Sequence, residues 1–175
     1  MSVSQLELRS LVLLRHAKAE RGDWGLDKDR GLAPRGQAQS AAVGRDLAGQ
    51  GFVPDVALVS SAKRTKQTYN LVATNAAWSL MADFLDDLYR AWTDDLIDLV
   101  CRVDPTARAV LVVGHEPTIS AAGLALASGE SDPEALARLN SGLPTAGRAE
   151  LRFAGDWIDL GPAKADLIEV ITPLA

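Results

Sequence analysis

The sequence contains two histidines, and each stands where an apolar run stops. His16 ends the stretch LVLLRH and has Arg15 beside it, whereas His115 ends the stretch VLVVGH. A neutral imidazole is a competent nucleophile toward phosphorus when an acceptor holds the proton of its other nitrogen. A second imidazole can donate a hydrogen bond to oxygens that gain charge in the transition state. The two histidines are therefore suited to phosphoryl chemistry if other residues bind the phosphoryl group.

Two arginines fit the same chemistry. Arg15 precedes His16, and Arg64 falls in the first turn of the helix expected after the second strand. A guanidinium presents a planar fork of donors that matches phosphate oxygens. The free N–H groups at the start of the helix near Ser61 also favour an anion. We therefore expect Arg15, His16, Arg64 and His115 to bind a phosphoryl group together.

Each of these residues also has a structural interpretation. A single histidine at a strand end is more often structural than catalytic, and Arg64 by itself would be a solvated helix residue. Their joint placement at three strand ends favours the site over these separate interpretations. A catalytic metal is the competing use of two histidines, but the sequence contains neither HxH nor HExxH. We therefore expect no metal.

Alternating apolar and amphipathic segments predict the elements that position these residues. Buried strands are expected at residues 11–15, 55–60 and 110–113, and late, partly alternating strands at 147–153 and 165–172. Helices are expected at 32–52, 61–76, 93–103 and 116–129. Ser60 or Ser61 is the expected cap of the second helix. Residues 83–92 are ambiguous.

This order predicts an α/β fold. Continuous apolar strands that alternate with helices are typical of a mostly parallel sheet covered on both faces, and the late strands suggest an antiparallel edge. We expect a three-layer α/β/α sandwich in a single domain, residues 1–175. Sites in such sheets form beyond the carboxyl ends of the parallel strands, which is where both histidines fall.

The composition excludes several classes of protein. The 175 residues are 47% apolar and 23% charged, with a net charge of −5, which fits a soluble globular protein. The acidic balance argues against nucleic acid or an anionic membrane as a partner. No apolar stretch approaches the length of about 20 residues that spans a bilayer, and the N-terminus lacks a secretory pattern. We expect a cytoplasmic enzyme or binding domain.

Several segments resemble the histidine phosphatase superfamily, which is also called phosphoglycerate mutase-like. LLRHAKAE resembles the signature of the nucleophilic histidine, LVSSAKRTKQT the segment of the phosphate-binding arginine, and VLVVGHEPTIS the segment of the second histidine. DRGLAPRGQAQS and LPTAG fit the small SixA-type phosphohistidine phosphatases. The resemblance covers nearly the whole chain, and it implies a phosphoglycerate mutase-like fold.

The resemblance also implies a mechanism. His16 would be transiently phosphorylated, and Arg15, Arg64 and His115 would complete the phosphate pocket. Water would then hydrolyse the phosphohistidine intermediate and release inorganic phosphate, without a metal or an organic cofactor. The substrate would be a phosphorylated protein that carries phosphohistidine, or a small phosphoester.

The sequence departs from the wider family in two places. Ala17 stands where the common signature has Gly, and the segment 76–105 is shorter than the one that supplies a lid and a carboxylic acid in larger relatives. Asp86, Asp87, Asp94 and Asp95 are not distinguished as that acid. A phosphohistidine can leave as neutral imidazole and needs an acid less than an alkoxide does. This weakly favours phosphohistidine as the substrate.

Other functions remain open at this stage. One is a phosphoryl-transfer mutase, against which the missing lid counts. Another is a non-catalytic phosphate-binding or signalling module, against which the presence of both histidines and both arginines counts. Trp24, in the loop after the first motif, either lines the rim of the pocket or packs over the neighbouring helix.

Overall fold

The computed structural model describes residues 7–22 and 25–173, and Trp24 lies outside them. These residues contain a six-stranded sheet of order β3-β2-β4-β1-β5-β6. The strands are β1 (Leu8–Arg15), β2 (Val56–Ser60), β3 (Asp83–Leu85), β4 (Ala109–Gly114), β5 (Arg148–Ala154) and β6 (Asp166–Ile171). The pairs β1–β4, β2–β4 and β2–β3 are parallel. Strand β5 is antiparallel to β1, and β6 is antiparallel to β5. The predicted antiparallel edge is confirmed.

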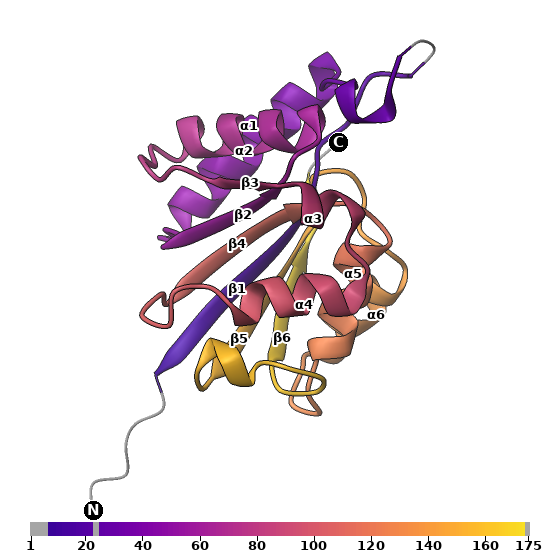
Figure 1. Ribbon diagram of the computed structural model, residues 1–175. Coiled ribbons are helices and arrows are strands. Elements are labelled where there is room, and N and C mark those ends of the chain that lie inside the picture. Colours follow the sequence, from indigo (N-terminus) through magenta and orange to yellow (C-terminus); the bar gives the residue numbers. More distant parts are fainter. Residues whose placement is uncertain (1–6, 23–24, 174–175) are drawn as a thin grey trace, which may run out of the picture.

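Helices cover both faces of this sheet. They are α1 (Pro34–Gly49), α2 (Lys63–Asn75), α3 (Asp86–Arg90), α4 (Thr93–Cys101), α5 (Thr118–Leu126) and α6 (Pro133–Asn140), with the 3-10 turns η1 (Asp27–Asp29) and η2 (Trp157–Asp159). Figure 1 shows α1 and α2 on one side of the sheet and α4, α5 and α6 on the other. The α/β fold is therefore the predicted three-layer α/β/α sandwich.

The apolar core has two parts because successive side chains of a strand point to opposite faces. In β4, Val110 and Val112 pack on the side of α4 and α5, whereas Leu111 and Val113 pack on the side of α1 and α2. All four side chains are fully buried. The unbroken apolar run of β4 thus reflects a strand covered on both faces.

Two parts of the chain differ from the sequence prediction. The ambiguous residues 83–92 divide into β3 and α3, and the change occurs between Leu85 and Asp86. Helix α6 was not predicted, although its start carries a recognisable signal. Asp132 precedes Pro133, and the Asp132 carboxylate accepts a hydrogen bond from the Ala135 N–H at 2.8 Å.

The predicted cap of α2 is wrong. The helix begins after Ala62, and no side chain caps it by a hydrogen bond. The Ser60 hydroxyl instead contacts His115, and the Ser61 hydroxyl donates to the Asp86 carboxylate. Both serines have the residue type of a cap, but tertiary contacts engage their hydroxyls. Sequence alone does not reveal such contacts.

Candidate active site

The two histidines meet because β1 and β4 are adjacent and in register. Arg15 at the end of β1 pairs with Gly114 at the end of β4, so the next residues, His16 and His115, extend from neighbouring positions. The backbone N–H of His16 donates to the Gly114 carbonyl at 3.0 Å. The centroids of the two imidazoles are 5.2 Å apart, with an angle of 60° between the rings. One sheet edge thus holds both rings.

Arg64 contacts both imidazoles from the start of α2. Its Nε donates to His16 Nε2 at 3.3 Å, and its Nη2 lies 3.4 Å from His115 Nδ1. The Arg64 side chain is 6% exposed, so its charge is largely enclosed by the protein. Three of the four predicted site residues are therefore in direct contact.

Hydrogen bonds define which nitrogen of each histidine carries its proton. His16 Nδ1 lies 2.8 Å from the Ala17 carbonyl, which can only accept, so Nδ1 is protonated and Nε2 holds a lone pair. Arg64 can only donate, so His115 Nδ1 is the accepting nitrogen of that ring. The proton of His115 is then on Nε2, which donates to the Ser60 hydroxyl at 2.7 Å. The two imidazoles are opposite tautomers.

Both imidazoles are neutral at pH 7. Burial is the main cause that lowers the pKa of His16 from 6.5 to about 4, and the charges of Arg64 and Arg15 lower it further, against the opposing effect of the Ala17 carbonyl. Burial also lowers the pKa of His115 to about 3, together with His16 and Arg64. A neutral His16 whose unprotonated Nε2 accepts only the long hydrogen bond from Arg64 has the form that a nucleophile requires.

Arg15 lies beside this group and is held by the LPTAG segment. Its Nη1 donates to the Leu143 carbonyl at 2.6 Å, while its Nε is buried without an acceptor among the described residues. The same segment bonds to the backbone next to the site. The Ala146 N–H donates to the His16 carbonyl, and the Gly147 carbonyl accepts from the Arg15 N–H. The segment thus fixes the chain at the end of β1.

Sequence reasoning missed two residues of the site, Asp27 and Tyr89. The Asp27 carboxylate forms an ion pair with Arg64 at 3.0 Å. The Tyr89 hydroxyl donates to the same carboxylate at 3.0 Å, and the Tyr89 ring packs edge-on against His115, with centroids 5.6 Å apart. Asp27 comes from η1 and Tyr89 from α3, so neither follows one of the predicted strand ends. No spacing signal in the sequence marks them.

Of the four aspartates considered as a general acid, two have other hydrogen-bond partners. Asp86 accepts from Lys28 and Ser61, and Asp95 accepts from the Trp92 N–H at the start of α4. Asp87 and Asp94 are exposed. Among the described residues, none of these four carboxylates hydrogen-bonds to His16, Arg64 or His115.

A hollow of about 220 Å³ adjoins His115. Its lining includes Tyr89, Trp92 and the segment from Gly114 to Thr118. Trp92 is 75% exposed, so its ring forms part of the open rim. The hollow can accept a group larger than phosphate next to His115.

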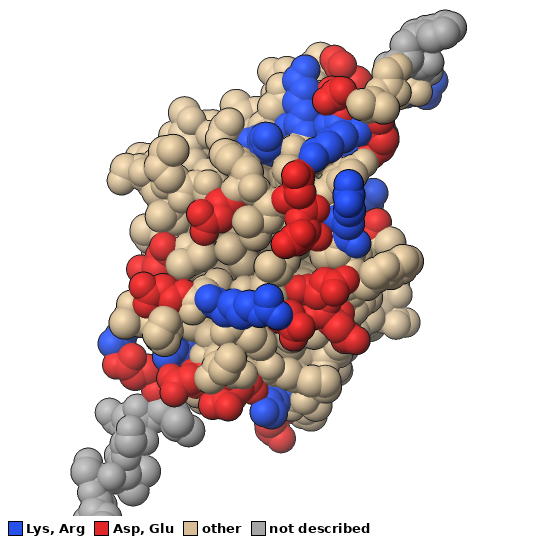
Figure 2. Space-filling view, viewed as in Figure 1, with Lys and Arg blue, Asp and Glu red and all other residues tan. Residues whose placement is uncertain are grey.

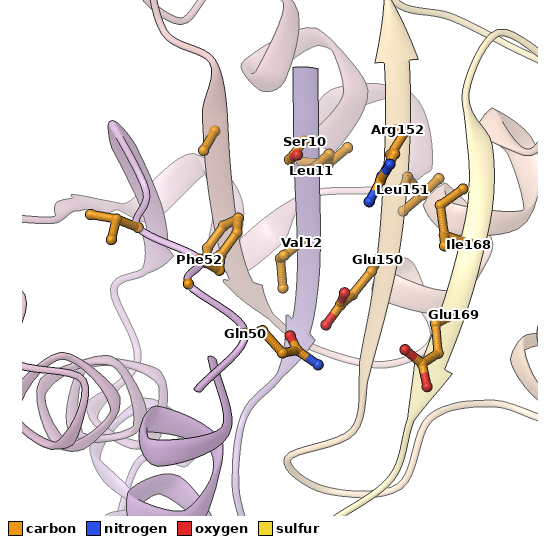
Figure 3. Close-up of a pocket in the computed structure, with 13 residues that line it drawn as sticks. Ser10, Leu11, Val12, Gln50, Phe52, Glu150, Leu151, Arg152, Ile168 and Glu169 are labelled. Atoms are coloured by element: carbon orange, nitrogen blue, oxygen red, sulfur yellow. The ribbon is translucent and has the colours of Figure 1, made fainter. Parts of the chain in front are cut away.

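A larger hollow lies away from the histidines. It has a volume of about 460 Å³ and is lined at the amino ends of β1 and β4 by Ser10 and Ala109, with Glu150 and Arg152 on β5. Figure 3 shows the polar side chains of Ser10, Glu150 and Arg152 together with Gln50 and Glu169 around the opening. Neither histidine lines it. Size therefore does not mark the chemical site of this molecule.

The visible face in Figure 2 carries Lys and Arg side chains mixed with Asp and Glu, in keeping with the net charge of −5. In the part of the chain that the structure describes, no helix is both long enough and apolar enough to cross a bilayer. Among the same residues, no cluster of three or more His, Cys, Asp or Glu side chains is arranged to hold a metal ion.

The fold and this group of residues define an α/β protein with a phosphate-compatible site at the carboxyl edge of its parallel strands. Residues 11–94 match the model of the histidine phosphatase superfamily (branch 1). An uncharacterized protein of Mycobacterium tuberculosis is 37% identical over 161 residues, which are 91% of this chain and 99% of that protein.

Two solved structures, each provisionally assigned as the phosphohistidine phosphatase SixA, are also similar. The one from Nakamurella multipartitia has 36% identity and a TM-score of 0.83, and the match covers 96% of this chain and 98% of that chain. The one from Agrobacterium tumefaciens has 28% identity and a TM-score of 0.78, and the match covers 94% and 98%. The chain belongs to the histidine phosphatase superfamily and is of the SixA type. The members of this superfamily are phosphatases.

Proposed function

We propose that the protein is a phosphohistidine phosphatase that works through a phosphohistidine intermediate on His16 and needs no metal. The observation that carries this proposal is the contact of Arg64 with both imidazoles, together with the unprotonated Nε2 of His16. A buried guanidinium that lies between two neutral imidazoles lacks an anion on that side. A phosphoryl group supplies the anion and lies within reach of the nucleophile.

The proposed reaction has two steps. His16 Nε2 attacks phosphorus, a P–N bond forms, and the bond from phosphorus to the leaving imidazole breaks. Water then attacks the same phosphorus, His16 leaves with the electron pair of the P–N bond, and inorganic phosphate is released. Arg15, Arg64 and His115 stabilise the charge on the same oxygens in both steps.

His115 is suited to this role through Ser60. A bound phosphoryl dianion raises the pKa of a nearby imidazole, because it favours the charged form. Protonated His115 can then donate from Nδ1 to a phosphoryl oxygen, while Ser60 continues to accept from Nε2. The ring therefore need not turn when substrate binds.

The surroundings favour an imidazole over an alkoxide as the leaving group. Hydrogen bonds from Arg30 and Arg64 are the main favourable cause that lowers the pKa of Asp27 to about 2, so Asp27 cannot donate a proton at neutral pH. The other four aspartates considered above do not contact the histidines. An imidazole needs less protonation as it leaves, and the hollow beside His115 can admit a side chain of a partner protein.

A trapping experiment tests the nucleophile. Wild type, His16→Ala and His115→Ala are mixed with labelled phosphohistidine carrier protein and quenched in alkali, where a P–N bond survives. We expect label on wild type and on His115→Ala but not on His16→Ala, and turnover by His16→Ala at least about a hundredfold slower. Label on His16→Ala would identify a different nucleophile.

Two further arms test substrate class and metal. Hydrolysis of the carrier protein is compared with that of p-nitrophenyl phosphate and of an alkyl phosphate, each with and without EDTA. We expect the carrier protein to be hydrolysed with the highest kcat/KM and EDTA to have no effect. Preference for p-nitrophenyl phosphate would indicate a small-molecule phosphomonoesterase, and loss of activity in EDTA would contradict metal independence.

A further inference from the structure

We propose that Asp27 is a positioning residue for phosphoryl binding, because it holds one edge of the Arg64 guanidinium and leaves the other edge facing the two histidines. This inference rests on the proposed function, since it assigns Arg64 to the phosphoryl group. Asp27 itself acts through Arg64 and does not contact the reacting atoms.

The hydrogen bonds of Arg64 divide between two edges of its guanidinium. On the outer edge, Nη1 donates to the Asp27 backbone carbonyl at 2.8 Å, and Nη2 donates to the Asp27 carboxylate at 3.0 Å. On the inner edge, Nε and Nη2 face His16 and His115 at 3.3 and 3.4 Å. The outer contacts are short and end on oxygen, whereas the inner contacts are long and end on nitrogen. A phosphoryl group can replace the inner contacts while the outer ones remain.

Asp27 is in turn held by its neighbours. Arg30 donates to Oδ1 from Nε at 3.0 Å and from Nη2 at 2.6 Å, and the Tyr89 hydroxyl donates to Oδ2 at 3.0 Å. The Tyr89 contact ties η1 to α3 across the site. Because the hydrogen bonds to both oxygens fix the carboxylate from two sides, Asp27 can restrict the orientation of the longer and more flexible Arg64 side chain.

The burial of the two charged side chains also supports a positioning role for Asp27. Arg64 is 6% exposed, whereas Asp27 is 52% exposed. A buried guanidinium needs an anionic partner when no substrate is bound, and Asp27 provides it at the solvent side of the site. If Asp27 instead occupied the position of the phosphoryl group, its removal would improve the binding of anions. The two roles predict opposite effects of the same substitution.

The test compares Asp27→Ala and Asp27→Asn with a matched control, Asp29→Asn. Asp29 lies in the same 3-10 turn, is exposed, and makes no side-chain hydrogen bond within the described residues. We expect Asp27→Ala to lower kcat/KM and to weaken vanadate inhibition, each by about tenfold or more, and Asp27→Asn to have a smaller effect. Asp29→Asn should stay within about twofold of wild type.

A double-mutant cycle separates positioning from a general structural role. In an Arg64→Ala background we expect Asp27→Ala to cause no further loss, because its partner is already absent. An equal loss with and without Arg64 would overturn the proposal, as would tighter vanadate binding by Asp27→Ala. If Asp27→Ala does not fold, Asp27→Asn is used in the same cycle.

Binding without turnover distinguishes this inference from the proposed function. Calorimetry with vanadate measures the affinity of wild type and Asp27→Ala even when no substrate is hydrolysed. Weaker vanadate binding by Asp27→Ala in an inactive protein would support the positioning role while the phosphatase assignment failed. Absence of vanadate binding to wild type would overturn both.

Discussion

The Ser60 hydroxyl lies 2.7 Å from Nε2 of His115, and it accepts the proton that the Arg64 contact assigns to that nitrogen. Ser60 ends β2 and His115 follows β4, and the two strands are paired in the sheet. The hydroxyl therefore supports His115 from the neighbouring strand, on the nitrogen that does not face Arg64.

Removal of this hydroxyl should reduce activity without unfolding the protein. A hydrogen bond worth about 1 kcal/mol corresponds to a roughly fivefold effect, so we expect Ser60→Ala to lower kcat by about that factor. Ser61→Ala is the matched control, because its hydroxyl donates to Asp86 at the surface. An equal loss in both variants would show that Ser60 does not act through His115.

The histidine tautomers can be observed directly by NMR. Because the chain has two histidines, an imidazole ¹⁵N–¹H correlation spectrum contains two ring systems, and His16→Ala assigns them. At pH 7 we expect a proton on Nδ1 of one ring and on Nε2 of the other. Lowering the pH to 5 should leave both neutral, because their pKa values are about 4 and about 3. Titration of either ring near pH 6.5 would contradict the burial of the site.

The same pKa values predict how stability depends on pH. Between pH 6.5 and about 4 the unfolded histidines are protonated while the folded ones remain neutral. The unfolded state then binds more protons, so the free energy of unfolding decreases as the pH falls through this range. Each histidine contributes at most about 1.4 kcal/mol per pH unit.

Urea unfolding at pH 7, 6, 5 and 4.5 measures this dependence. His16→Gln with His115→Gln should give a flatter profile than wild type over the same range. Asp27 adds a loss only below its unfolded value of 3.8, because its folded pKa is about 2, and this effect falls outside the measured window. A wild-type stability that does not change from pH 6.5 to 4.5 would refute the prediction.

Gly36 in α1 permits a close approach to the loop that follows His16. A Cβ atom at this position would lie 2.0 Å from the Lys18 carbonyl oxygen, which also accepts from the Ala33 N–H at 3.0 Å. We expect Gly36→Ala to destabilise the protein by about 1–3 kcal/mol, because backbone would have to move.

Gly49 in the same helix is the control for this substitution. A Cβ there meets nothing within 4 Å, so Gly49→Ala should leave the thermal midpoint unchanged or slightly higher. Thermal unfolding of both variants and the kcat of Gly36→Ala measure the effect. A Gly36→Ala protein with wild-type stability would show that the close approach is not required.

Much of this protein was determined by local sequence. The apolar runs at β1 and β4 predict buried strands because both faces of each are covered, and this places His16 and His115 at one edge of a parallel sheet. Arg15 and Arg64 follow from the same reasoning, since each stands next to a strand end. The antiparallel edge follows from the partial alternation of β5 and β6.

The tertiary structure decided which polar groups contact each other in the site. It also brought in site residues that no local sequence pattern marks. Ser60 has the residue type of a helix cap, yet its hydroxyl contacts His115 because β2 and β4 are neighbours. Asp27 and Tyr89 are 62 residues apart and meet only when η1 and α3 lie together across the site. A local pattern reports whether a side chain is buried and which face it occupies. The partner of a polar group depends on which distant segment the fold brings beside it.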